Sequence, residues 1–292
     1  MLTSAGVAAG FKLTTMATIA PGNSGCCDGP FGLAVDSMGH IVVGTGAGPR
    51  YVFADADGQV PATALFTDLS FGTFTGAYAI TGGVVYGATG AGPYVSFNLD
   101  GTVANPDAFP GLISRLGMWT NPINGHLIAQ SAFGLTDIDP VTKSWRVIAA
   151  IGRDAVSVSP DGTTAYIRDK CLEPVDIATG AIGPCINASP AADGTVTILG
   201  GPFDGFIVAS SNLGNVDLID PFDNTFVTIA TGGTRGQYVA FDPGDSSLLL
   251  DEADIVARLS CPGCASAPPP PVPEPATLTL FAALLAVRRK RH

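Results

Sequence analysis

The sequence repeats a pattern of apolar runs and turns at a nearly constant interval, and this repeat constrains the fold most strongly. Residues 45–53 read TGAGPRYVF and residues 89–97 read TGAGPYVSF, so the two segments begin 44 residues apart. Weaker copies of the turn recur at a mean interval of 41 residues and end at Gly39, Gly83, Gly125, Gly162, Gly205 and Gly244. Six units of 41 residues occupy 246 positions, close to the 250 between Phe11 and Ser260.

Each unit reads as a set of short strands. The first contains GLAVD, HIVVGT, RYVFAD and ATALFTDL, separated by turn residues. Val, Ile, Phe and Tyr favour strands, and turns every 8–12 residues indicate an all-β fold. Four strands in a unit of this length are typical of a propeller blade. We therefore predict an all-β, six-bladed β-propeller over residues 11–260, with seven blades or an open array as the alternatives.

One strand stands outside the repeat. Residues 11–19 (FKLTTMATI) precede the first unit, whereas the sixth unit lacks a clear fourth strand. We expect the first segment to pair onto the last blade and close the ring. Cys26 or Cys27 would then lie near Cys261 or Cys264 and could lock this seam.

Short segments resemble known propeller repeats. Residues 156–182 and 216–229 resemble YVTN-type repeats, with an SPDG turn and a strand followed by an acidic turn. Residues 31–43 (FGLAVDSMGHIVV) are more similar to an NHL repeat. Both resemblances imply the propeller architecture and leave the activity open, because propellers host both binding and catalysis.

The chain is strongly acidic. It has 14 basic and 25 acidic residues, and Asp outnumbers Glu by 22 to 3. This charge excludes nucleic acid as a partner, because phosphate backbones are repelled. Many Asp residues stand beside Gly or Pro, where their side chains cap turns.

Six cysteines favour disulfides in an oxidising compartment over a metal site. Cys171 and Cys185 flank a predicted hairpin, which makes a cross-strand bridge plausible. The pair in Cys261-Pro262-Gly263-Cys264 has redox-type spacing, but no strand and helix follow it, so we interpret it as structural.

The end of the chain changes composition abruptly. Residues 261–271 form a linker rich in Cys and Pro, and residues 276–287 are an apolar run. The run lies between the motif Pro273-Glu274-Pro275 and the basic cluster Arg288, Arg289, Lys290 and Arg291. We interpret the run as a helix, with its basic end cytoplasmic. Its 12 residues span about 18 Å as a helix, against about 30 Å of hydrocarbon.

This order of parts resembles the PEP-CTERM sorting signal, a tail also called an ice-binding protein C-terminal domain. The resemblance covers residues 272–292. It implies export, a short transmembrane helix that anchors the precursor in the inner membrane, processing by an exosortase, and a Gram-negative producer of extracellular polysaccharide. Polysaccharide or another surface protein is then an expected partner. Residues 1–10 are a poor signal peptide, so we interpret them as a leader remnant or a disordered terminus and place the true start upstream.

Candidate catalytic groups are few. His40 and His126 occupy equivalent places in units one and three, which leaves a paired site or a repeated turn residue as interpretations. Aspartates 55, 57, 137, 139, 217, 220 and 223 complete no EF-hand pattern, so turn capping is favoured over calcium. Lactonase-type propellers hold an axial metal with Glu, Asn and Asp, and only Glu173 and Glu252 precede the tail.

The sequence thus favours a non-catalytic binding or structural module at the cell surface or in the extracellular matrix. We expect no cofactor, with calcium as the alternative. A lactonase- or lyase-like enzyme with an axial site is the alternative function.

Overall fold

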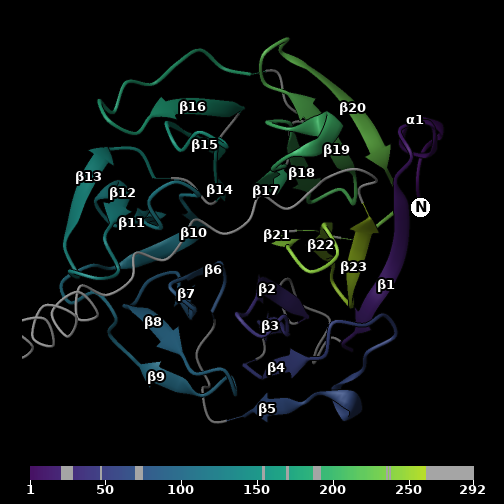
Figure 1. Cartoon of the computed structure of the whole chain (residues 1–292), viewed down its shortest axis with the longest axis horizontal. Helices are drawn as coiled ribbons and strands as arrows, with labels where there is room; N and C mark the ends of the chain where they lie inside the picture. The colour runs from purple at the N-terminus through teal and green to yellow at the C-terminus, as the bar shows by residue number, and fades with distance from the viewer. Residues whose placement is uncertain are drawn as a thin grey trace, which may run out of the picture.

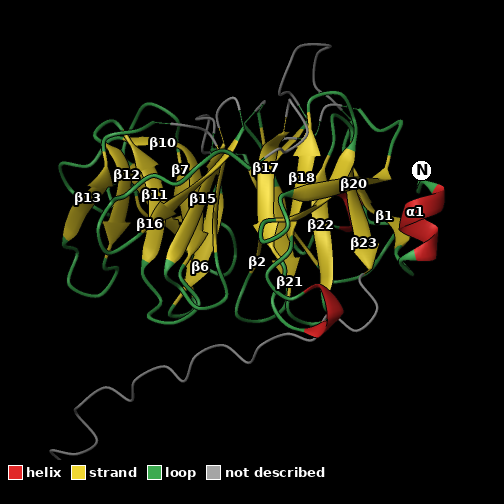
Figure 2. Cartoon of the chain, turned by 90° about the horizontal axis from the view of Figure 1, so that it is seen from above, coloured by secondary structure: helices red, strands yellow, loops and turns green. Residues whose placement is uncertain are grey.

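The computed structural model describes residues 1–20, 29–46, 48–69, 75–152, 155–168, 171–186, 192–234, 236 and 238–260. Six sheets stand in a ring around a central axis, each forming one blade (Figure 1). Seen from the side, the blades stand next to one another in a flat disc (Figure 2). The prediction of an all-β, six-bladed propeller is confirmed. In the described part of the chain, no helix is long and apolar enough to cross a bilayer.

The blades follow one another in chain order, and the innermost strand of each comes first. Blades 1 to 3 consist of β2 (Pro30–Val35), β3 (Ile41–Thr45), β4 (Arg50–Phe53), β5 (Phe66–Asp68); β6 (Tyr78–Thr81), β7 (Val84–Ala88), β8 (Tyr94–Phe97), β9 (Val103–Asn105); β10 (Ser114–Thr120), β11 (Leu127–Ser131), β12 (Gly134–Ile138) and β13 (Trp145–Ala149). Blades 4 to 6 consist of β14 (Ala155–Val158), β15 (Thr164–Arg168), β16 (Leu172–Asp176); β17 (Ala192–Thr197), β18 (Ile207–Ser211), β19 (Val216–Asp220), β20 (Thr225–Ala230); β21 (Val239–Asp242), β22 (Ser247–Asp251), β23 (Ile255–Ser260) and β1 (Lys12–Thr18).

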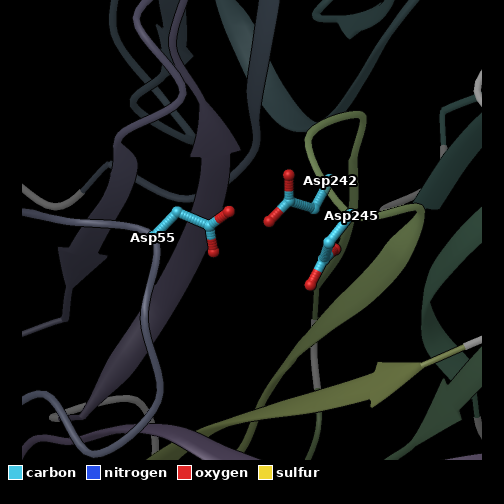
Figure 3. Close-up of side chains that lie close together, drawn as sticks. All are labelled: Asp55, Asp242 and Asp245. Carbon is cyan, nitrogen blue, oxygen red and sulfur yellow. The ribbon is translucent and has the colours of Figure 1, made fainter.

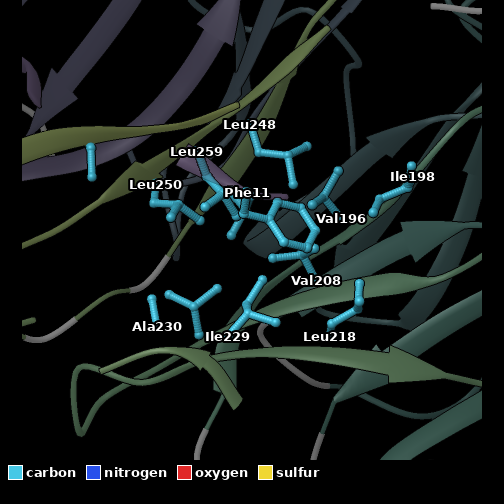
Figure 4. Packing of buried hydrophobic residues seen from close by; sticks show 13 residues of the cluster. Phe11, Val196, Ile198, Val208, Leu218, Ile229, Ala230, Leu248, Leu250 and Leu259 are labelled. Carbon is cyan, nitrogen blue, oxygen red and sulfur yellow. The ribbon is translucent and has the colours of Figure 1, made fainter. Parts of the chain in front are cut away.

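The first strand closes the ring. β1 pairs antiparallel with β23, from Lys12 opposite Ser260 to Thr18 opposite Ile255. Phe11 inserts into the core between blades 5 and 6, where it packs with Val196, Leu248 and Leu259 (Figure 4). The predicted pairing of the amino-terminal strand with the last blade is therefore confirmed.

The amino terminus lies against blade 5. Residues 1–10, which we expected to be a leader remnant or disordered, contain the short helix α1 (Ser4–Ala8). The Thr3 amide donates to the Ile229 carbonyl at 2.9 Å. Gly6 lies so close to the same strand that a Cβ there would stand 2.2 Å from the Ile229 carbonyl oxygen. The segment is thus held by contacts that a disordered terminus would not make.

The blades are held together by apolar side chains that project from both faces of the inner strands. Ile128 of blade 3 packs against Val156 of blade 4, and Leu249 of blade 6 packs against Leu33 of blade 1. Each blade buries its faces against its neighbours, which explains the nearly continuous apolar runs. Two single-turn 3₁₀ helices, η1 (Pro61–Thr63) and η2 (Gly201–Phe203), lie in connections.

Blade 4 has three strands among the described residues. A disulfide joins Cys171 and Cys185, whose Cα atoms are 5.8 Å apart. Leu172 bridges to Ile186 beside it, so the bond crosses the predicted hairpin. This disulfide is confirmed; Cys26, Cys27, Cys261 and Cys264 lie outside the described residues.

Candidate functional site

The two ends of the central axis differ in chemistry. The inner strands all run in the same direction, so their last residues, and the hairpin turns that follow, lie at one end, here named the turn end. The second strand of each blade runs back and finishes at the opposite end, here named the polar end.

The axis between these ends is narrow and mostly apolar. Its lining includes Leu33, Ala77, Gly117, Ala155 and Val239, and the central cavity has a volume of ≈ 20 Å³. One or two water molecules fill such a space. The interior of the axis therefore has no room for an organic ligand.

A cavity of ≈ 260 Å³ opens at the turn end. Val35, Ile80, Trp119, Phe241 and Pro243 are among its lining residues. They come from the ends of the inner strands of four blades, together with the turn after β21. We call this cavity the apolar mouth.

Polar side chains lie close together at the polar end, at the last residues of the second strands. Alternation along each strand identifies the residue there that faces the next blade: Ile128 packs on blade 4, so Gln130 faces blade 4 as well. Tyr166, Val208 and Leu249 also pack on the next blade. By the same alternation, Arg168, Ser210 and Asp251 each face the next blade. The six equivalent residues are Gly44, Ala88, Gln130, Arg168, Ser210 and Asp251. The last four are polar and buried, with exposed fractions of 0%, 5%, 1% and 1%.

Gln130 is the most unusual member of this set. Neither Nε2 nor Oε1 of its side chain has a hydrogen-bond partner among the described residues. An unsatisfied buried amide costs about 1–3 kcal/mol. The next residue, Ser131, lines a polar cleft of ≈ 560 Å³ together with Arg115, Phe133 and Gly152, among others. This volume suits a small organic ligand.

Ser210 and Asp251 are held closely by the chain around them. A Cβ at Gly236 would lie 1.9 Å from Ser210 Oγ, so only glycine allows this approach. The amide of Tyr238, a residue that lines the axis, donates to Asp251 Oδ1 at 2.5 Å. The backbone thereby fixes the Asp251 carboxylate close to the axis.

Glu252 is the next residue and has a different environment. Thr234 Oγ1 donates to its Oε2 at 2.9 Å, and burial raises the pKa of the Glu252 carboxyl. A carboxyl with a raised pKa is suited to proton transfer near neutral pH. Glu252 lines a separate cavity of ≈ 210 Å³ between blades 5 and 6, on the other side of the ring from Gln130. Glu173 lies in the third strand of blade 4, opposite Ile167 of β15.

The described residues contain one carboxylate cluster that could attract a metal ion, and it does not lie on the axis. Asp55, Asp242 and Asp245 point toward one another between blades 1 and 6, with oxygens within 4.8 Å (Figure 3). The Arg258 guanidinium lies among them: Nη1 is 3.0 Å from Asp242 and 2.7 Å from Asp245. It also contacts Asp55, and its Nε donates to Asp57 at 2.9 Å. Because this cation holds the carboxylates, a metal ion does not fit.

The other acidic residues and the histidines make local contacts. The Asp220 side chain accepts from the Phe222 amide at 2.9 Å, and the Thr142 hydroxyl lowers the pKa of Asp139. His40 lies 3.1 Å from Asp36, and His126 lies 2.8 Å from Asp137. Each histidine is therefore paired within its own blade. The tail residues Pro273, Glu274, Pro275, Arg288, Arg289, Lys290 and Arg291 lie outside the described residues.

The four buried polar residues Gln130, Arg168, Ser210 and Asp251 were not predicted from the sequence. A signal was available, because Gln130 and Ser210 each stand five residues after the glycine of their repeat turn, at 125 and 205. Aligning the units on these glycines places Gly44 and Ala88 at the same offset in the first two units. Arg168 and Asp251 stand six and seven residues after Gly162 and Gly244, so this alignment does not find them.

Known structures share this fold. A gluconolactonase from Xanthomonas campestris matches 89% of this chain and 93% of its own, with 16% identity and a TM-score of 0.67. Regucalcin from Agrobacterium tumefaciens, a calcium-binding protein, matches 87% of this chain and 98% of its own, with 16% identity and a TM-score of 0.62. An auxiliary nutrient binding protein from Bacteroides thetaiotaomicron matches 86% and 76%, with 12% identity and a TM-score of 0.61. No family model and no curated protein sequence matches the chain.

These likenesses show the fold, a six-bladed propeller. They also contradict one prediction. We expected a chain without enzymatic activity, but a gluconolactonase has this architecture over nearly the whole length of the chain. The absence of familiar catalytic motifs was therefore a poor reason to exclude an enzyme, because propeller sites are assembled from single residues of separate blades.

Proposed function

We propose that this chain is a propeller enzyme of lactonase type, which opens small cyclic esters at the polar end of its axis. Two observations support the proposal. The fold is shared with a gluconolactonase, and buried polar side chains occupy equivalent positions in four successive blades at this end. The observation that carries it is the Gln130 side chain, which is fully buried and lacks a partner among the described residues. Ser131, the next residue, lines a polar cleft.

The reaction proposed is the hydrolysis of a cyclic ester. Water adds to the ester carbonyl, the ring C–O bond breaks, and the hydroxy acid formed ionises to a hydroxy carboxylate and a proton. An amide N–H such as that of Gln130 can donate to the carbonyl oxygen as negative charge develops on it. The exposed Arg115 guanidinium, which also lines the cleft, would attract the carboxylate formed.

The axial metal that lactonase-type propellers imply does not fit the described residues. Their only cluster of three metal-ligating groups is filled by Arg258, away from the axis. We therefore derive no step through a metal ion and propose none as a cofactor.

A ring-opening assay tests this function. Proton release from glucono-1,5-lactone and from simpler five- and six-membered lactones is measured with the full chain and with Gln130→Leu. We expect at least a tenfold loss in kcat/KM, because removing one oxyanion donor costs about 10²–10³ in rate. Leucine at 130 would face apolar neighbours such as Ile128, so the melting temperature should not fall.

Gln59→Leu, at a surface position away from both axial ends, is the matched control and should retain full activity. Folded wild-type protein that opens none of these lactones above the buffer rate would refute the proposal. So would a Gln130→Leu variant with unchanged kcat/KM.

We further propose that the protein is exported and that an exosortase processes its tail, after which it stays at the surface or in the surrounding polysaccharide. The motif Pro273-Glu274-Pro275 with the apolar run and basic cluster supports this. Mass measurement of the mature chain in its native cells is expected to show loss of the basic end. A chain that keeps Arg291 and stays in the cytoplasm would contradict the proposal.

A further inference from the structure

We propose that in the unprocessed precursor the carboxy-terminal segment, residues 272–292, docks back onto the turn end of its own propeller. In this arrangement the apolar run 276–287 covers the apolar mouth and the basic cluster 288–291 contacts aspartates around it. The docking surface is at the opposite end of the axis from the proposed lactone site, and it is independent of that function.

The mouth offers a mostly apolar surface. Val35, Ile80, Trp119, Leu199 and Phe241 are among its lining residues, and the last four are partly exposed. The turns around the mouth add exposed apolar side chains, since Met38 is 65% and Ile123 61% exposed. An occupant that buries this surface must itself be apolar.

The surroundings of the mouth are acidic. Many of the hairpin turns at the turn end carry aspartates, including Asp36, Asp100 and Asp161, so much of the acidic charge lies at this end. The exposed members are Asp55, Asp57, Asp100, Asp161, Asp176, Asp204, Asp223 and Asp245. An apolar centre with an acidic rim fits an apolar segment that carries a basic flank.

The chain itself supplies such a segment. Residues 276–287 read ATLTLFAALLAV, and Arg288, Arg289, Lys290 and Arg291 follow directly. A helix of 12 residues measures about 18 Å, short of the roughly 30 Å hydrocarbon core of a bilayer. Its length suits a surface cavity better than a full membrane crossing.

The tail also leaves the propeller at the correct end. Ser260, the last described residue, pairs with Ser247, which directly follows the turn after β21. β23 is the third strand from the axis, and adjacent strands lie about 4.8 Å apart, so the inner strand is only about 10 Å away. The 15 residues 261–275, between the propeller and the apolar run, can extend to about 50 Å at roughly 3.3 Å per residue. The tail is therefore long enough to reach the apolar mouth of its own chain.

Trp119 provides a reporter inside the mouth. The chain has two tryptophans, and Trp145→Phe leaves Trp119 as the only one. In this full-length background without detergent, acrylamide quenching of Trp119 is compared with that of Phe281→Asp/Leu284→Asp. We expect faster quenching and red-shifted emission in the variant, because the apolar run no longer covers the mouth. Ala265→Asp/Ser266→Asp in the linker is the matched control and should change neither.

A photo-reactive phenylalanine analogue at position 281 identifies the occupant directly. Docking in one chain predicts cross-links within single molecules to the peptides that contain Ile80, Trp119 or Phe241, independent of protein concentration and weakened by salt. Ile80→Asp should abolish them, whereas Leu213→Asp, an exposed position at the polar end, should not. Cross-links between two copies, cross-links only to added lipid vesicles, or none to the mouth would overturn the proposal.

Discussion

Many aspartates of this protein hold turns, and in some of these turns a neighbouring hydroxyl group changes the pKa of the carboxyl. The hydroxyl groups of Thr142 and Thr179 donate to Asp139 and Asp176 and lower the pKa of each carboxyl. A carboxyl with a lowered folded-state pKa stabilises the fold above its unfolded pKa of about 3.9, and this contribution is lost as the pH falls. Burial raises the pKa of Asp242 and of Glu252, so these two groups act in the opposite direction.

Removing the two hydroxyl donors should therefore reduce acid sensitivity. Between pH 6 and pH 3, we expect the melting temperature of Thr142→Val/Thr179→Val to fall less than that of the wild type. Calorimetry in buffers of equal ionic strength measures this difference. Thr67→Val, an exposed strand position, is the control and should follow the wild type. A double variant with an unchanged acid-induced drop would show that these caps do not titrate as described.

At the scale of the strand, the amino-terminal segment carries the ring closure. Phe11 is 3% exposed and stacks on Phe203 with ring centroids 5.4 Å apart. It brings residues from the start of the chain into the core between the last two blades. We expect Phe11→Ala to lower the free energy of unfolding by about 3–5 kcal/mol, the usual cost of removing a buried aromatic ring.

Urea denaturation of the purified chain measures this change. Phe222→Ala removes the same ring from a turn where it is 78% exposed, and should change the free energy of unfolding by less than about 0.5 kcal/mol. Similar losses for the two variants would mean that the first strand does not hold the ring together.

The strands and their order were predictable from sequence, whereas the site was not. Turn glycines such as Gly39 and Gly162 repeat because they adopt positive φ angles of 78° and 71°, which few other residues tolerate. The last unit lacked a fourth strand, whereas residues 11–19 formed a strand outside the repeat. The number of strands therefore indicated that the first strand closes the ring. Cys171 and Cys185 were predictable because they flank one hairpin.

Gln130 and Ser210 share only their spacing from the turn glycine, which does not indicate a site. Their importance comes from burial and from the absence of a partner among the described residues, and neither property can be read from a polar residue at the end of a strand. The same holds for Arg258, whose four aspartate partners come from blades 1 and 6 and lie up to 203 residues away in the chain. Contacts across the seam of a closed ring depend on a geometry that no local pattern contains.

At the scale of the whole molecule, we propose that the two axial ends bind different partners. We propose that the polar end, with Gln130, Ser210 and Asp251, takes the small cyclic ester. The turn end of the unprocessed precursor takes its own tail. The narrow axis, with its cavity of ≈ 20 Å³, separates the two. A ligand that binds one end should therefore leave the other unchanged.

Hydrogen–deuterium exchange of the full chain with a non-hydrolysable lactam analogue of the lactone tests this claim most directly. We predict slower exchange in the peptides at the ends of β11, β18 and β22, which contain Gln130, Ser210 and Asp251. Peptides of the turn end, such as the one containing Val35 and Met38, should exchange as they do without the analogue. Protection confined to the turn end, or equal exchange everywhere at saturating analogue, would contradict the account.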